Sequence, residues 1–234
     1  MTDKSNPRVS QSLDSAASGL GLARWAGNFA PGTISGSVYA VPAANRIHAA
    51  RLLTGHGHRV HVDLIVAADG THTGVTPEQL LLMRQAVPDA RFDVHLILPS
   101  TDMNGPARSA SETAIRAAGS VNAEFFALAP RLLHDLIDDL EDLRTKEVPI
   151  WAEVAIGDDL TGLRRADGAL VMLIESGTKN VADRSQLRKV VRLAGTTPVG
   201  IDGGVTAAVA AEGLLAGADV IISGRALFEL ADRK

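Results

Sequence analysis

Short apolar segments alternate with longer segments of helical pattern from residue 34 to the end of the chain. The apolar segments are rich in Val and Ile and fall at residues 35–41, 59–66, 91–98, 123–129, 149–156, 169–175, 198–202 and 219–223. The helical patterns occupy residues 43–53, 76–86, 107–118, 131–146, 159–165, 183–193 and 206–216, with a last short helix expected at 226–232. Because the apolar segments are nearly continuous, they are typical of parallel strands that are buried on both faces.

The regular order of strand and helix predicts an α/β fold with a parallel sheet and right-handed crossovers. Eight such units in about 200 residues favour a closed (β/α)8 TIM barrel, and an open doubly wound sheet is the alternative. One helix start has local support, since Thr76 is a capping residue and Pro77 suits the first helical position. No linker interrupts residues 34–234, which are therefore predicted to form a single domain.

The first 33 residues differ from the rest and are predicted to be an N-terminal extension, residues 1–33. Residues 1–18 are rich in Ser, Asp and Asn and show no period. Residues 20–29 fit a short amphipathic helix that ends near Pro31 and Gly32. We expect a partly flexible tail followed by a docking helix, with a functional arm as the alternative.

Composition excludes several classes of function. The chain has 234 residues, with 23 basic and 27 acidic side chains and 3% aromatic residues, so it lacks the charge and the stacking surface of a nucleic-acid-binding protein. It contains no cysteine, which excludes disulfides, thiolate metal sites and cysteine nucleophiles. No apolar stretch reaches about 18 residues and residues 1–18 do not resemble a signal peptide, so we expect a cytoplasmic protein with no membrane partner.

Histidine and aspartate side chains recur at the ends of three predicted strands, where barrel enzymes carry their active sites. His61 and Asp63 alternate on the second strand, His95 lies on the third, and Asp202 ends the seventh. Asp93 shares the period of His95 and is expected to cap a loop or to support His95. Two imidazoles and two carboxylates can hold Zn²⁺, Fe²⁺, Mn²⁺ or Co²⁺, whereas each alone is commonly a satisfied polar group at a strand end.

The loops after the last two strands are suited to binding an anion. Gly203 and Gly204 follow the seventh strand. Ser223, Gly224 and Arg225 follow the eighth and are predicted to open the last short helix. Phosphate sites of barrel enzymes commonly lie here, because glycines admit close backbone approach and a helix N-terminus favours negative charge. The alternative is that these glycines serve only tight turns.

These pieces together resemble the ribulose-phosphate 3-epimerase family, whose members are (β/α)8 barrels. The matching motifs run in order through the chain: His61-Val62-Asp63, Asp69-Gly70, Asp93-Val94-His95-Leu96, Val171-Met172, Asp202-Gly203-Gly204-Val205, Ala216-Gly217-Ala218-Asp219 and Ser223-Gly224-Arg225-Ala226-Leu227-Phe228. The resemblance implies that His61, Asp63, His95 and Asp202 bind one divalent metal ion (Zn, Fe, Mn or Co). It also implies that Asp63 removes the C3 proton of a sugar phosphate and that Asp202 returns one to the opposite face, through a metal-stabilised ene-diolate.

The sequence departs from the family at the substrate loops. The family's Pro-Gly-Phe-Gly-Gly-Gln segment is replaced by residues 175–180, which include Gly177 and Lys179, and Arg225 stands where the family has serine. The family's first-strand serine aligns near residues 40–42, where no hydroxyl stands, so this polar contact is expected to be lost. Lys179 and Arg225 either replace backbone phosphate contacts or bind a different anionic group. The expected substrate-binding residues are Met172, Gly177, Lys179, Gly203, Gly204, Ser223, Gly224 and Arg225.

Three functions follow from this pattern. The first is a metal-dependent isomerase that interconverts D-ribulose 5-phosphate and D-xylulose 5-phosphate. The second is an epimerase for another ketose or ketose phosphate, as the changed loop at 175–180 favours. The third is a barrel that binds metal or phosphate without turnover. The resemblance further suggests a homo-oligomer.

Overall fold

Eight parallel strands close into a barrel in the computed structural model, which describes residues 19–99, 103, 105–163, 165–176 and 178–230. The strands follow one another around the barrel in chain order: β2 (Ile34–Ser37), β3 (Arg59–Ile65), β4 (Phe92–Ile97), β5 (Phe125–Leu128), β6 (Ile150–Val154), β7 (Gly168–Met172), β8 (Val199–Asp202) and β9 (Val220–Ser223). Pairing of β2 with β9 closes the circle. The predicted (β/α)8 TIM barrel is confirmed, and the open sheet is excluded.

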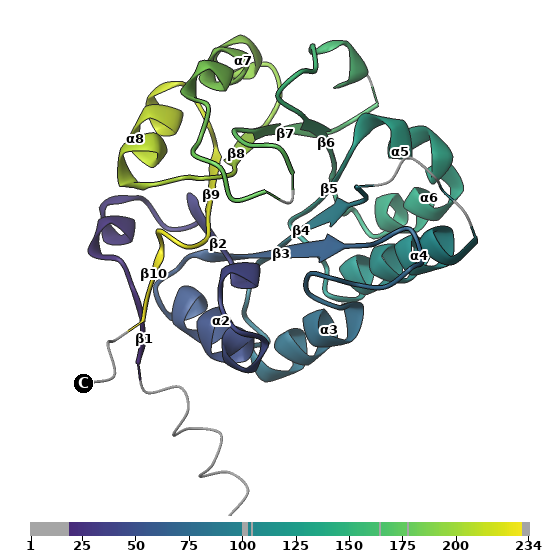
Figure 1. The fold of residues 1–234 in the computed structure, drawn as a ribbon, viewed down its shortest axis with the longest axis horizontal. Coiled ribbons are helices and arrows are strands. Elements are labelled where there is room, and N and C mark those ends of the chain that lie inside the picture. Colours follow the sequence, from purple (N-terminus) through teal and green to yellow (C-terminus); the bar gives the residue numbers. More distant parts are fainter. Residues whose placement is uncertain (1–18, 100–102, 104, 164, 177, 231–234) are drawn as a thin grey trace, which may run out of the picture.

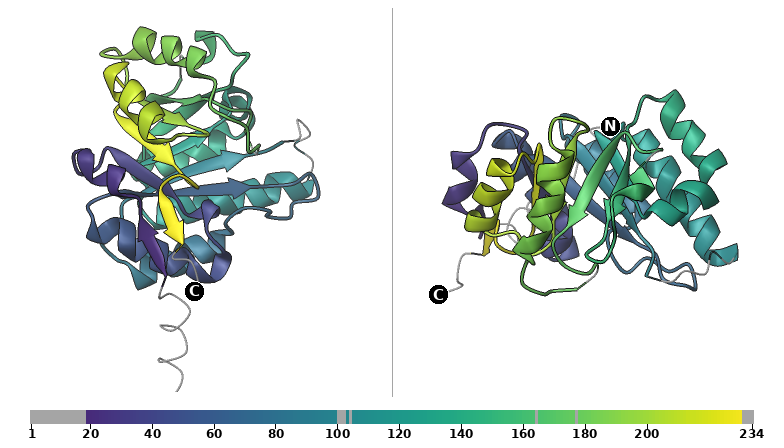
Figure 2. Two further views of the ribbon diagram at one scale, coloured as in Figure 1. Left: turned by 60° about the vertical axis from the view of Figure 1, so that its left-hand side comes forward. Right: turned by 90° about the horizontal axis from the view of Figure 1, so that it is seen from above.

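Helices surround the barrel on its outer side (Figures 1 and 2). They are α2 (Arg46–Gly55), α3 (Pro77–Ala86), α4 (Gly105–Ser120), α5 (Pro130–Asp135), α6 (Ile137–Thr145), α7 (Leu187–Leu193) and α8 (Ala207–Leu215). Helix α3 begins as predicted, because the Thr76 hydroxyl accepts a hydrogen bond from the Gln79 backbone and the Gln79 side chain accepts one from the Thr76 backbone. The single helix predicted at 131–146 is divided at Leu136. In the segment predicted as a helix at 159–165, the described residues form only a 3-10 turn, Thr161–Leu163.

Aromatic rings fill the N-terminal part of the barrel interior. Phe125 of β5 and Trp151 of β6 stack with ring centroids 4.0 Å apart and planes 6° from parallel. Gly168 of β7 makes room for this stack, since a Cβ there would lie 2.5 Å from the Trp151 indole. This packing leaves the C-terminal ends of the strands as the place where polar side chains can gather.

Both ends of the described chain differ from the sequence-based prediction. The helix predicted at residues 226–232 is wrong, because residues 228–230 form strand β10 (Phe228–Leu230), which pairs antiparallel with β1 (Leu20–Leu22). The helix predicted at 20–29 is wrong too, since β1 is followed by the 3-10 helix η1 (Arg24–Asn28). Segments this short have no period that separates helix from strand, and each strand supplies the backbone partners of the other.

The described part of the extension is attached to the loop that follows β9. Trp25 Nε1 donates to the carbonyl of Ala226 at 3.0 Å, and the Ala23 N–H donates to that of Leu227 at 2.8 Å. Residues 1–18, for which a tail is predicted, lie outside the described residues. Within the described ranges, the helices are too short or too polar to cross a bilayer.

Candidate metal centre

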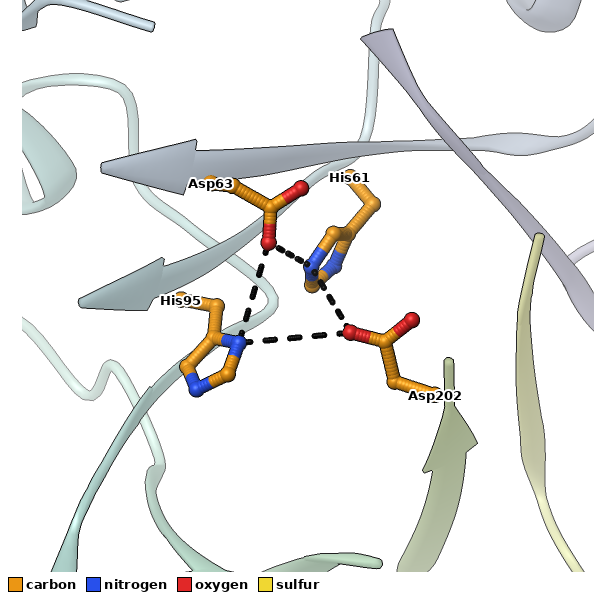
Figure 3. A group of neighbouring side chains, drawn as sticks. All are labelled: His61, Asp63, His95 and Asp202. Carbon is orange, nitrogen blue, oxygen red and sulfur yellow. Dashed lines mark hydrogen bonds and ion pairs between the residues drawn. The ribbon is translucent and has the colours of Figure 1, made fainter. Parts of the chain in front are cut away.

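Two histidines and two aspartates from three strands converge at the C-terminal end of the barrel (Figure 3). His61 and Asp63 come from β3, His95 from β4 and Asp202 from the end of β8. Each offers one nitrogen or oxygen atom, and these four atoms lie within 4.8 Å of one another. The structure therefore brings together all four residues that the sequence singled out as metal ligands.

Strand geometry explains this convergence. His61 and Asp63 are two residues apart on β3 and so point to the same side. Asp63 is paired in register with His95 on the neighbouring strand β4. Asp93, two residues before His95, pairs with Arg59 at 3.1 Å. Asp93 is thus part of a buried ion pair below the cluster and not a support for His95.

The donor atoms fit a divalent metal ion. His61 Nε2 lies 3.2 Å from Asp63 Oδ1 and 3.8 Å from Asp202 Oδ2. His95 Nδ1 lies 3.7 and 4.0 Å from the same two oxygens. Ligands about 2.1 Å from a tetrahedral metal stand about 3.4 Å apart, close to these separations. His95 Nδ1 is fully buried and has no hydrogen-bond partner among the described residues, which a metal ion would supply.

The two carboxylates have different proton affinities in the absence of metal. Burial favours the neutral form of both, but the adjacent charges and hydrogen bonds of His61 and His95 hold the pKa of Asp63 far below its ordinary value. Burial, together with the negative charge of Asp63, raises the pKa of Asp202 to about 6. A carboxylate with a lowered pKa beside a carboxylate with a raised pKa is the arrangement expected of a general base paired with a general acid.

The two aspartates favour the charged form of both histidines. Burial disfavours the imidazolium of His95, but the negative charges of Asp63 and Glu153 and the hydrogen bond to Glu153 prevail and raise the pKa of His95 to about 10. Burial opposes the charge on His61 as well, yet Asp63 raises its pKa. A metal ion that binds here therefore displaces protons.

Sequence reasoning missed the side chains that form hydrogen bonds to this cluster from neighbouring strands. Ser37 Oγ, at the end of β2, donates to Asp63 Oδ2 at 2.7 Å. The expected loss of a first-strand hydroxyl is thus wrong. The family's serine position was expected at residues 40–42. Strand β2 ends earlier, at Ser37, and is followed by a 3-10 turn, Val38–Ala40. Ser35 and Ser37 alternate along the first strand, and this pattern could have predicted a hydroxyl near the strand end.

Glu153 and Ser176 form the second supporting group. Glu153 Oε2, on β6, accepts a hydrogen bond from His95 Nε2 at 2.9 Å, and Ser176 Oγ donates to Glu153 Oε1 at 2.7 Å. Although burial favours the neutral acid, the contacts with His95 hold the pKa of Glu153 below its ordinary value. A lone glutamate inside an apolar strand, in Ile150–Val154, is the signal that the sequence offered.

A cavity of about 620 Å³ opens beside the cluster and contains most of the predicted substrate-binding residues. Both Asp63 and Asp202 line it, and the predicted residues that line it are Met172, Lys179, Gly203, Gly204, Gly224 and Arg225. Ser223 does not, because its buried hydroxyl donates to the carbonyl of Val205 at 2.8 Å. Gly177 lies outside the described residues.

The end of this cavity for which the sequence predicted anion binding lacks the expected helix, since β10 follows Arg225. Arg225 instead reaches across to the neighbouring loop, where its guanidinium donates to the carbonyl of Lys179 at 3.1 Å. Gly203 and Gly204 have positive φ angles of 101° and 64°. A Cβ on Gly204 would lie 2.8 Å from the Ala182 nitrogen, so the close approach of the two loops requires glycine.

A second cavity of about 490 Å³ adjoins the first and shares Ile97 and Ser176 with it. It lies over the ends of β4, β5 and β6, on the side of the cluster away from Lys179 and Arg225. Its polar lining includes Arg131, Glu153 and Asp158. The two cavities together flank the cluster of His61, Asp63, His95 and Asp202.

Comparison with known proteins supports the barrel and leaves the family open. No family model and no curated protein matches this sequence. A variant of the tryptophan synthase alpha-subunit from the hyperthermophile Pyrococcus furiosus has a TM-score of 0.60 at 11% identity, over 85% of this chain and 89% of that one. Phosphoribosyl anthranilate isomerase from Thermus thermophilus has a TM-score of 0.56 at 12% identity, over 82% and 87%. Likeness at such identities shows the fold alone.

Proposed function

We propose that this protein is a metal-dependent sugar-phosphate 3-epimerase whose substrates are D-ribulose 5-phosphate and D-xylulose 5-phosphate. One observation carries the proposal. Asp63 and Asp202 stand on different strands, line the same cavity and share the same two histidines. Inversion at a carbon without a covalent intermediate needs two acid–base groups on opposite faces of the substrate, and the shared cavity supports the assignment of these two roles to the pair.

One divalent ion would be held by His61, Asp63, His95 and Asp202. When bound, it supplies Lewis acidity toward the substrate carbonyl, which makes the adjacent C3–H bond acidic enough for a carboxylate to break. The rest of the chemistry belongs to the side chains of the chain itself.

Proton transfer is assigned to the two aspartates. Asp63 takes the proton from C3 on one face. The electron pair of the C–H bond forms a C2–C3 double bond, and the π pair of the C2 carbonyl moves onto its oxygen, which gives an ene-diolate. Asp202 delivers a proton to C3 from the opposite face, the electrons return to the carbonyl, and the configuration is inverted. Ser37 fixes Asp63 Oδ2 and leaves Oδ1 turned toward the cluster centre.

The phosphate is assigned to the far end of the cavity. Lys179 and Arg225 supply positive charge there, and the backbone around Gly203, Gly204 and Gly224 admits close approach. This side-chain clamp is our interpretation of the changed loop at residues 175–180, in place of the family's glycine-rich segment.

The direct test is NMR of D-ribulose 5-phosphate with metal-loaded protein in D₂O. We expect deuterium to enter C3 and D-xylulose 5-phosphate to appear. Asp63→Asn and Asp202→Asn should each abolish epimer formation, with the metal content measured to separate a lost proton carrier from a lost ligand. Asp158→Asn is the matched control, because this exposed carboxylate contacts a loop amide and no histidine. Epimerisation that persists in Asp63→Asn would refute the assignment.

The second cavity favours another candidate, an epimerase for a different ketose or ketose phosphate. A five-carbon substrate with its phosphate at Lys179 leaves the space beyond Ile97 and Ser176 unfilled. A panel of pentulose and hexulose phosphates, and of the free ketoses, distinguishes the two by which C3 proton exchanges fastest. Bound metal without exchange in any of them would indicate a non-catalytic barrel.

A further inference from the structure

A buried carboxylate that takes no part in the proposed proton transfer is in direct contact with one ligand of the metal centre. Glu153 lies on β6, a strand that contributes none of the four ligands, and only 8% of its surface is exposed. A charged group in such a position is costly unless each oxygen is paired. The partners of Glu153 therefore indicate what it does.

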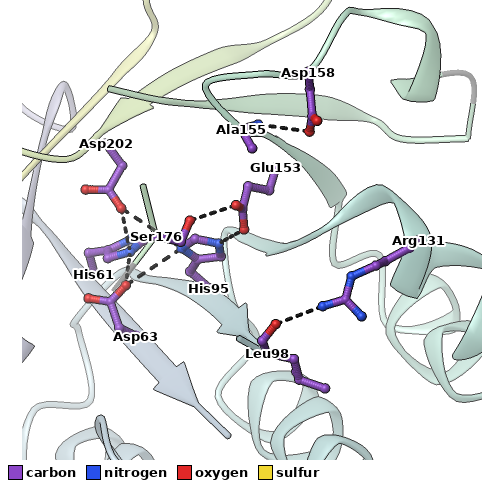
Figure 4. A network of polar contacts seen from close by, with 10 residues as sticks. All are labelled: His61, Asp63, His95, Leu98, Arg131, Glu153, Ala155, Asp158, Ser176 and Asp202. Atoms are coloured by element: carbon purple, nitrogen blue, oxygen red, sulfur yellow. Dashed lines mark hydrogen bonds and ion pairs between the residues drawn. The ribbon is translucent and has the colours of Figure 1, made fainter. Parts of the chain in front are cut away.

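Each oxygen of Glu153 has one partner. Oε2 accepts from His95 Nε2 at 2.9 Å, and Oε1 accepts from Ser176 Oγ at 2.7 Å (Figure 4). A carboxylate is an acceptor, so the His95 nitrogen facing it carries the proton. The opposite nitrogen, Nδ1, is then the one that faces Asp63 Oδ1 and Asp202 Oδ2, 3.7 and 4.0 Å away, and its lone pair would bind a metal ion once its own proton has left.

We propose that Glu153 is a positioning residue for the metal centre, which fixes the ring orientation and the Nδ1-ligating tautomer of His95, and that Ser176 in turn orients Glu153. The inference rests on the proposed metal site. Carboxylates that hold a metal-ligating histidine from behind commonly contribute 10–100-fold to metal affinity. The contact also ties the segment after β7, which lines both cavities through Ser176, to a ligand of the ion.

The test measures Zn²⁺ affinity by competition with a chromophoric chelator. Glu153→Leu removes both the acceptor and the charge and should weaken Zn²⁺ binding by about 100-fold. Glu153→Gln keeps an acceptor oxygen and loses the charge, so its Zn²⁺ binding is expected to be about tenfold weaker than that of the wild type. Ser176→Ala should weaken binding by less than Glu153→Gln. Asp158→Asn, a carboxylate of the loop after β6 that contacts no histidine, should bind as the wild type does.

A spectroscopic readout separates positioning from general loosening of the barrel. In the zinc-loaded wild type, long-range ¹H–¹⁵N spectra should show a protonated Nε2 and a metal-bound Nδ1 for His95. Glu153→Leu should lose the protected Nε2–H signal, and Glu153→Gln should retain it. Circular dichroism and urea unfolding of the metal-free variants report whether each folds.

The outcomes are distinguishable. If Glu153→Leu binds Zn²⁺ as tightly as the wild type and keeps the Nε2–H signal, the positioning role is overturned while the metal site stands. If Glu153→Leu does not fold, Glu153→Gln decides, and wild-type affinity in that variant overturns the role. If the wild type itself binds no Zn²⁺, both the proposed metal-dependent function and this role are refuted.

Discussion

Metal binding should release at least one proton at neutral pH, and this proton comes from His95. The pKa of His95 is raised to about 10 in the metal-free protein. At pH 7.5 the charged form then outnumbers the neutral form by about 300 to one, so one full proton must leave before Nδ1 can bind a metal. Since the folded-state pKa lies above the ordinary value, this competition strengthens as the pH falls below about 10 and disappears as the pH rises through that value.

The expected magnitude follows from this displacement. Each pH unit between about 7 and 9 should raise the apparent affinity for Zn²⁺ at least tenfold, which corresponds to about 1.4 kcal/mol per unit. His61, whose pKa is also raised, adds to the slope. Isothermal titration in buffers of different ionisation enthalpy counts the protons directly. Tight binding at pH 7.5 with no proton released would refute the electrostatic account of His95.

Further predictions concern turnover, substrate binding and stability. Ser37→Ala should slow C3 exchange by about tenfold or more, because Asp63 loses a charge-assisted hydrogen bond; unchanged exchange in D₂O would contradict this. Lys179→Ala and Arg225→Ala should each raise KM for a phosphorylated ketose and leave kcat nearly unchanged; steady-state kinetics of phosphorylated and free ketoses check it. Trp151→Ala should lower the free energy of unfolding by about 3–5 kcal/mol in urea titrations, since its stacked ring fills the barrel; a loss below about 1 kcal/mol would contradict the packing argument.

The barrel and the convergence of its histidine–aspartate cluster could be predicted from the sequence for a simple reason. Strands buried on both faces have continuous apolar sequences. A polar residue that interrupts such a sequence near its end needs a hydrogen-bond partner, an opposite charge or a metal ion at the barrel mouth. His61, Asp63 and His95 interrupt two adjacent runs with the same two-residue period. The fold then brings them together through register alone.

The supporting residues could not be predicted in the same way, because their partners are far apart in sequence. Glu153 follows His95 by 58 positions, and only the closed barrel makes the two neighbours. Ser37 was missed because strand β2 ends earlier than its apolar pattern does, at a 3-10 turn that pattern analysis does not recognise. The terminal strands were missed because three-residue strands depend on a tertiary partner and not on local period.

The pairing of β1 with β10 has a consequence for how the chain is made. Leu20 meets Leu230, so this contact joins the first and the last described strands of the polypeptide. During synthesis β1 leaves the ribosome before the eight barrel strands, yet its partner β10 follows all of them. Strand β1 therefore stays unpaired until β10 has been synthesised, and a nascent chain that stalls between the two exposes that strand edge to pairing with another chain.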